Sequence, residues 1–106
     1  MSITLKLDPS PTFWSKVDIP IPGAPKGVEI ECEFGHMDRD AFAVFTDTAT
    51  ARTDIDGTMA ILRSWRGPDA AFSREAVAKL LQNYHGASFA ITEKFCSELG
   101  KLRSGN

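Results

Sequence analysis

The sequence predicts an α+β fold, with an N-terminal antiparallel three-stranded meander packed against three or four C-terminal helices. Two observations lead to this prediction. Apolar and polar residues alternate with period two through much of residues 3–34, which is typical of strands with one buried face. After Gly35 the apolar spacing becomes helical. Strands that all precede the helices favour an antiparallel sheet with helices on one face, because a parallel sheet requires the two to alternate.

Three segments are expected to form the strands. The first, residues 3–8, alternates Ile, Leu and Leu with polar residues, and the second, residues 13–21, continues the pattern until two prolines end it. In the third, residues 28–34, the apolar positions alternate with three glutamates, which predicts a solvated acidic outer face. Cross-strand pairing with Lys6 or Lys16 would offset the repulsion between these glutamates.

Two helices are expected directly after the strands. The first begins at Asp38, whose carboxylate can accept hydrogen bonds from free backbone N–H groups. Its apolar side consists of Ala41, Phe42, Val44 and Phe45. The second begins at Asp54 or Asp56, follows an i, i+4, i+7 apolar pattern, and ends at Trp65 before a Gly-Pro pair.

Two further helices complete the expected helical region, residues 38–102. Ser73 is a good N-cap for the third helix, which Gly86 closes. The last helix is expected over residues 88–102, with its large apolar residues on or near one stripe. No linker or internal repeat divides the 106 residues, so a single domain spanning residues 1–106 is expected, with strands in 1–35 and helices in 38–102.

Charge and hydropathy argue against several kinds of partner. The 12 basic residues are scattered among 14 acidic ones, with a net charge of -2, and form no stripe that would bind nucleic acid phosphates. No apolar run reaches the roughly 20 residues needed to span a bilayer, and the first residues lack the pattern of a signal peptide. A cytoplasmic protein without a membrane partner is therefore expected.

The reactive residues do not predict an enzyme. Cys32 and Cys96 lie far apart among apolar positions and are expected to be buried, reduced thiols. His36 and His85 each lie at an element boundary, where a surface or capping role is more common than catalysis. No close pair of Cys or His predicts a metal site, and no glycine-rich loop predicts a phosphate site, so no catalytic residue, metal or cofactor is expected.

Two carboxylates close together in Asp54-Ile55-Asp56-Gly57 are similar to the start of a calcium loop. The later acceptors and the terminal Glu of such a loop are missing, so helix capping explains this segment better.

The aromatic residues suggest a binding function. Seven Phe, two Trp and one Tyr are many for a small core, and an exposed apolar patch would mark a partner site. Packing in the core is the alternative role for each ring. The candidate partner-binding residues are Phe42, Phe45, Trp65, Tyr84, Phe89 and Phe95.

Several stretches together carry a resemblance that covers nearly the whole chain. They are residues 13–23, the 28–34 strand, residues 65–75 with a Trp-Arg-Gly-Pro turn before Ser73, and residues 80–87 with Tyr-His-Gly-Ala. This pattern resembles the tail assembly chaperones of tailed bacteriophages. In the family's Tyr-x-Gly-Ala segment Pro is expected more often than His85.

The resemblance implies a non-enzymatic protein, made in the cytoplasm of an infected or lysogenic host, that keeps the tape-measure protein soluble and helps to recruit tail tube subunits. It further implies absence from the mature virion and, in parts of the family, a C-terminal extension added by ribosomal frameshifting. Two alternatives stay open: a structural tail component that remains in the particle, and a small host adaptor or regulatory protein. Self-association through a bare strand edge is also left open.

Overall fold

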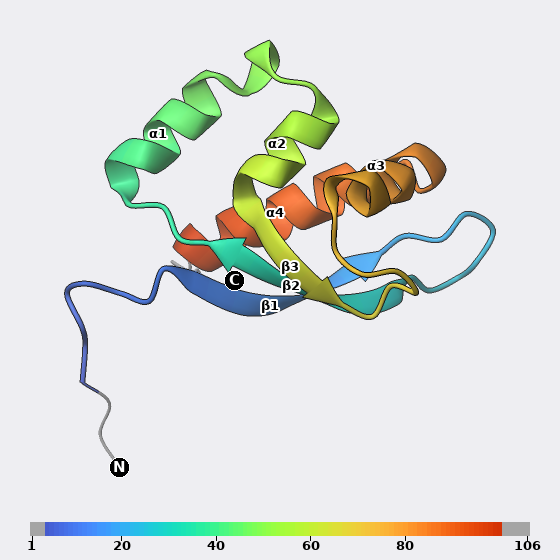
Figure 1. Cartoon of the computed structure of the whole chain (residues 1–106), viewed down its shortest axis with the longest axis horizontal. Helices are drawn as coiled ribbons and strands as arrows, with labels where there is room; N and C mark the ends of the chain where they lie inside the picture. The colour runs from blue at the N-terminus through green and yellow to red at the C-terminus, as the bar shows by residue number, and fades with distance from the viewer. Residues whose placement is uncertain (1–3, 101–106) are drawn as a thin grey trace.

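A three-stranded antiparallel sheet, ordered β1-β2-β3, carries all four α-helices on one side (Figure 1). The structure is a computed structural model that describes residues 4–100. The predicted fold class is confirmed: the protein is α+β, with an antiparallel sheet and helices that cover one of its faces.

The first two strands form where the alternation is clearest. β1 (Thr12–Ile19) pairs with β2 (Val28–Gly35) in a continuous antiparallel register from Thr12↔Gly35 to Ile19↔Val28. This register places Phe13, Val17 and Ile19 of β1 on the same, helix-covered face as Ile30, Cys32 and Phe34 of β2, and the glutamates on the other face. The Lys16 ammonium lies 3.7 Å from the Glu29 carboxylate, so the predicted cross-strand pairing is confirmed for Lys16.

The third strand comes from the region predicted to be wholly helical. α2 (Asp54–Ile61) ends at Ile61, and β3 (Leu62–Arg66) pairs antiparallel with β2, opposite Glu31–Phe34. The prediction of a helix as far as Trp65 is therefore wrong after Ile61. Leu62 fits the apolar stripe of a continued helix, but the strand conformation pairs the free edge of β2, and this pairing outweighs the local pattern.

The expected first strand is absent from the sheet. Residues 4–8 pair with no strand, and Ile3 lies outside the described residues. Leu5 and Leu7 are 84% and 90% exposed, so the prediction of a buried apolar face here is wrong, as is the pairing of Lys6 with the glutamates. Two nearby prolines, Pro9 and Pro11, explain the difference, because they disfavour the tight reversal that would return this segment to β1.

The first helix begins as predicted. In α1 (Arg39–Asp47) the Ala41 N–H donates to the Asp38 carboxylate over 2.8 Å, which confirms the Asp38 cap. A short 3₁₀ turn, η1 (Ala49–Ala51), then leads to α2.

The last two helices also follow the prediction closely. In α3 (Arg74–Asn83) the Ala76 N–H donates to the Ser73 hydroxyl over 3.0 Å, which confirms the Ser73 cap. α4 (Ala87–Gly100) packs against β1 and α2. The expected extension of this helix to residue 102 lies outside the described residues.

The core lies between the sheet and α4, and the ring of Phe95 occupies its centre. The Phe95 ring lies 5.5 Å from Phe34 and 6.3 Å from Phe13 between centroids, so it contacts both β2 and β1. Rings at these separations stabilise each other beyond the burial of their area. The buried hydrophobic residues are Val17, Ile19, Ile30, Cys32, Phe34, Ile61, Leu62, Trp65, Val77, Ala87, Ile91 and Phe95.

Truncation of Phe95 should be far more destabilising than the same truncation elsewhere on α4. Phe95 is fully buried, so Phe95→Ala is expected to lower the free energy of unfolding by about 3–5 kcal/mol through lost burial and an unfilled cavity. Phe89 is 71% exposed on the same helix, so the control Phe89→Ala should stay within about 0.5 kcal/mol of the parent protein. Urea unfolding measures both, and similar losses for the two variants would contradict this placement of the core.

Candidate partner-binding surface

Large apolar side chains are exposed on several elements of the described chain. They belong to the segment before β1, to both long strands, to α1 and to the first turn of α4. The residues are Leu5, Leu7, Trp14, Val28, Val44 and Phe89. Such side chains mark a partner site only where neighbouring apolar groups extend them into a patch, so their surroundings decide which are candidates.

α1 presents the most continuous apolar side chains. None of its residues is buried, Val44 is 62% exposed, and Phe42 and Phe45 are only partly buried. The centroids of the Phe42 and Phe45 rings lie 6.3 Å apart, and 6.2 and 6.0 Å, respectively, from that of Phe95. α1 thus contacts α4 through the rings of Phe42 and Phe45, while the side chain of Val44 faces solvent.

Arg52 holds the C-terminal end of α1. Its guanidinium donates to the Phe45 carbonyl over 2.8 Å and to the Thr48 hydroxyl over 2.7 Å. The same group lies 4.3 Å from the centroid of the Phe45 ring, which is a cation–π geometry. A cation beside a free carbonyl at a helix C-terminus is favourable for the helix dipole, so Arg52 fixes both this end of α1 and the Phe45 ring.

The six residues proposed from the sequence occupy three kinds of position. Phe42, Phe45 and Phe95 come together in one ring cluster, in which Phe95 is fully buried. Trp65 is 8% exposed, donates its indole N–H to the Ala70 carbonyl and meets Phe72 edge to face. Tyr84 is partly buried at the C-cap of α3, and Phe89 is exposed on α4.

Val44 is an exposed apolar residue of α1 that is not among the six partner-binding residues predicted from the sequence. The sequence places it on the apolar side of α1, and the structure shows that this part of the helix points away from the core. The helical spacing of apolar residues already includes Val44. Spacing cannot show, however, which apolar positions of a short peripheral helix remain uncovered.

The outer face of the sheet is a polar network. The Arg66 guanidinium lies 4.0 Å above the Trp14 ring and 3.6 Å from the Glu31 carboxylate, while the Thr12 hydroxyl donates to Glu33. Trp14, although 40% exposed, is therefore covered by a cation on this face. The three glutamates of β2 serve here as partners of basic and hydroxyl groups, as expected for a solvated face.

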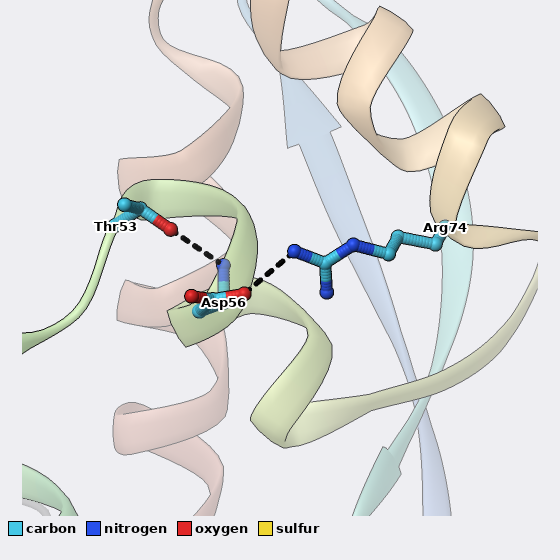
Figure 2. Close-up of polar contacts among 3 residues, drawn as sticks. All are labelled: Thr53, Asp56 and Arg74. Carbon is cyan, nitrogen blue, oxygen red and sulfur yellow. Dashed lines mark hydrogen bonds and ion pairs between the residues drawn. The ribbon is translucent and has the colours of Figure 1, made fainter.

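The paired carboxylates that are similar to a calcium loop, Asp54 and Asp56, lie in the first turn of α2. Figure 2 shows Asp56 with its partners Thr53 and Arg74. The Asp56 N–H donates to the Thr53 hydroxyl over 3.2 Å, and the Arg74 guanidinium donates to the Asp56 carboxylate over 2.6 Å. Arg74 begins α3, so this ion pair joins the N-terminal ends of two helices. α2 begins at Asp54 as predicted, but Thr53 is its N-cap, so the capping interpretation is wrong for the two carboxylates. They lie in the first turn instead, where negative charge is favourable for the helix dipole.

Loss of the Asp56 charge should make stability less dependent on pH in the acid range. The hydrogen bond from Arg74 lowers the pKa of the Asp56 carboxyl below its usual 3.8, and the Thr53 contact acts in the same direction. A lowered pKa adds stability above the usual value, which is lost as the pH falls through the folded-state pKa. Asp56→Asn is expected to be less stable than the parent protein at pH 7, with the difference vanishing in strong acid.

Thermal unfolding between pH 7 and pH 2 measures this effect. Asp54→Asn is the matched control, because Asp54 lies in the same helical turn and has no ion pair with Arg74. A constant difference between Asp56→Asn and the parent protein over the whole range would show that the ion pair does not couple to protonation.

The two cysteines are buried or partly buried, whereas the two histidines are exposed. Cys32 and Cys96 are both free, and burial raises the pKa of the Cys32 thiol to about 12 and raises that of Cys96. The prediction of a buried thiol is confirmed for Cys32, whereas Cys96 is only partly buried because it lies beside the core on α4. His36 and His85 are both exposed. Within residues 4–100 no group of three or more His, Cys, Asp or Glu side chains is placed to hold a metal ion.

The fold and this surface define a small α+β protein whose candidate site is an exposed, partly aromatic helix. No helix among residues 4–100 has the length and apolar character required to cross a bilayer. The family model for the phage tail assembly chaperone matches residues 1–106, the whole chain, and the protein belongs to this family. Membership implies that it works on phage tail proteins. No curated protein and no solved structure matched the chain.

Proposed function

We propose that the protein binds the tape-measure protein of its phage or prophage in the bacterial cytoplasm and assists assembly of the tail tube around it. In this proposal it acts without catalysis and leaves before the virion is complete. Family membership supports the assembly role, and the surface of α1 supports binding of an apolar client.

The observation that carries the proposal is that α1 is a regular helix without a single buried residue. Its partly buried rings, Phe42 and Phe45, lie beside the exposed side chain of Val44. A tape-measure protein consists largely of long amphipathic helices, whose apolar stripes aggregate in water unless they are covered. Such a stripe can lie along α1, because helices bind one another through side chains repeated at i, i+3 and i+4.

A site of this size binds weakly, and weak binding suits a chaperone that must be released. Val44 and the exposed parts of two rings offer only a small apolar area per copy. Many copies along one client multiply these contacts into high avidity. Tube subunits that polymerise along the client can then displace the chaperones one at a time.

The experiment that tests the proposal is co-expression of the protein with the tape-measure protein from the same gene cluster. The parent protein is expected to keep the client in the soluble fraction and to co-purify with it. Val44→Glu places a charge on the exposed surface of α1, and we expect it to weaken binding about tenfold or more, because the glutamate must lose its water in the complex.

Val28→Glu is the matched control for this experiment. Val28 is 55% exposed, so the two substitutions change the same chemistry at similarly exposed sites, and neither should affect folding. If Val44→Glu and Val28→Glu bind the tape-measure protein equally well, α1 is not the surface that binds it. Detection of the protein in purified virions by mass spectrometry would favour a structural tail component instead.

A further inference from the structure

Residues 4–8 have the side-chain pattern of a strand but no partner strand, and the chain bends at Leu7 and Asp8. We call residues 4–8 the N-terminal arm. Leu5 and Leu7 are 84% and 90% exposed, and Figure 1 shows that the arm leads away from the sheet. Exposed leucines at alternate positions are unfavourable in water, so the arm gains stability wherever one of its faces is covered.

The arm is prevented from pairing with β1 of its own chain by the residues that connect them. Pro9 and Pro11 fix their own φ angles, and both Asp8 and Ser10 precede a proline, which biases them toward extended backbone. A tight hairpin needs a helical or left-handed conformation at these positions. The Pro11 carbonyl also accepts a hydrogen bond from the His36 N–H over 2.8 Å, which holds the end of the connection at β2.

The outer edge of β1 is the longest open strand edge in the described chain. β1 has eight residues and pairs with β2 on one side only, whereas β3, at the other edge, has five residues and an irregular register. An open groove of about 510 Å³ lies where this edge meets α4. The groove is lined by residues of β1, β2 and α4: Lys16, Val17, Asp18, Glu29, Ala90, Glu93, Lys94 and Ser97.

The arm matches this edge in its side-chain pattern, and the groove lining carries three acidic side chains, Asp18, Glu29 and Glu93, against two basic ones, Lys16 and Lys94. A strand added beside β1 alternates its side chains between the helix-covered face and the outer face. With Leu5 and Leu7 toward α4, they lie over Ala90 and the aliphatic part of Lys94, while Lys6 lies on the outer face near Asp18 and Glu29. The opposite orientation would place both leucines in water and Lys6 against the core.

We propose that the arm of one copy adds as a fourth strand to the β1 edge of a second copy of this chain. Each copy carries both the arm and the edge, so two copies can exchange arms reciprocally and close a two-fold dimer. The exchange pairs the backbone groups of an otherwise open edge and covers two leucines per chain. This self-association does not depend on the proposed client or on α1.

The position of the arm can be tested by cross-linking two differently tagged chains. Both carry Cys96→Ser; one has Lys6→Cys in the arm and the other has Lys16→Cys on the outer face of β1, where Lys16 is exposed. A short bis-maleimide is expected to join the two chains. The control partner carries Arg63→Cys on the opposite edge, β3, and should give at least about tenfold less product, because the arm lies on β1.

Sedimentation equilibrium supplies a second, independent measurement. The double variant Leu5→Glu and Leu7→Glu is expected to raise the dimer dissociation constant at least about tenfold, because two buried apolar side chains are replaced by charges. Both residues are exposed in the single chain, so folding should be unaffected. Val44→Glu, on α1, should dimerise like the parent protein.

Three results would overturn the proposal. One is a parent protein that stays monomeric throughout the micromolar range. Another is equal cross-linking to the β1 and β3 edges. The third is a monomer that cross-links only when both cysteines are on the same chain, which would show the arm folding back on its own sheet.

Discussion

The ring of Phe95, on α4, packs against side chains from β1, β2 and α1, which are distant from it in the sequence. It contacts Phe13 of β1, Phe34 of β2, and Phe42 and Phe45 of α1, with centroid distances of 5.5–6.3 Å. The sheet, α4 and α1 therefore meet at one side chain. Because α1 is attached mainly through these rings and Arg52, it keeps its place on the domain while much of its own apolar surface remains in water.

This arrangement gives the two faces of the sheet different roles. Helices cover the inner face and complete the core, and the outer face is a network of glutamates with Lys16 and Arg66. Exposed large apolar groups lie on α1 and on the N-terminal arm, and also at Trp14 of β1, Val28 of β2 and Phe89 of α4. A domain of this size has few places to bury large side chains, so those that remain exposed are the natural surfaces for binding a client or another copy.

Local signals in the sequence predict most of the elements but not all of their partners. The alternation in β1 and β2 and the caps at Asp38 and Ser73 act over a few residues, and these elements form as expected. β3 was missed because its conformation is set by pairing with a strand about 30 residues earlier, against a helical spacing. The arm has the alternating pattern of a buried strand, but the adjacent prolines, Pro9 and Pro11, decide where it can pair.

The candidate site was predictable only in part, for a related reason. Helical spacing identifies Phe42, Phe45 and Phe95 as apolar positions, yet it cannot rank their burial. Only the packing of α1 on α4 shows that Phe95 is the buried centre and that Val44 stays outside. The composition predicts more aromatic residues than a small core can bury. The exposed apolar surface also contains aliphatic side chains, which the composition does not predict.

The central claim is that α1 is the surface that receives the client. Hydrogen–deuterium exchange of the protein, alone and bound to the tape-measure protein, tests it most directly, because exchange reports each helix separately. The account predicts that binding slows exchange in residues 39–47 more than in residues 74–83 of α3. Unchanged exchange in α1, with slowing confined to other elements, would contradict it.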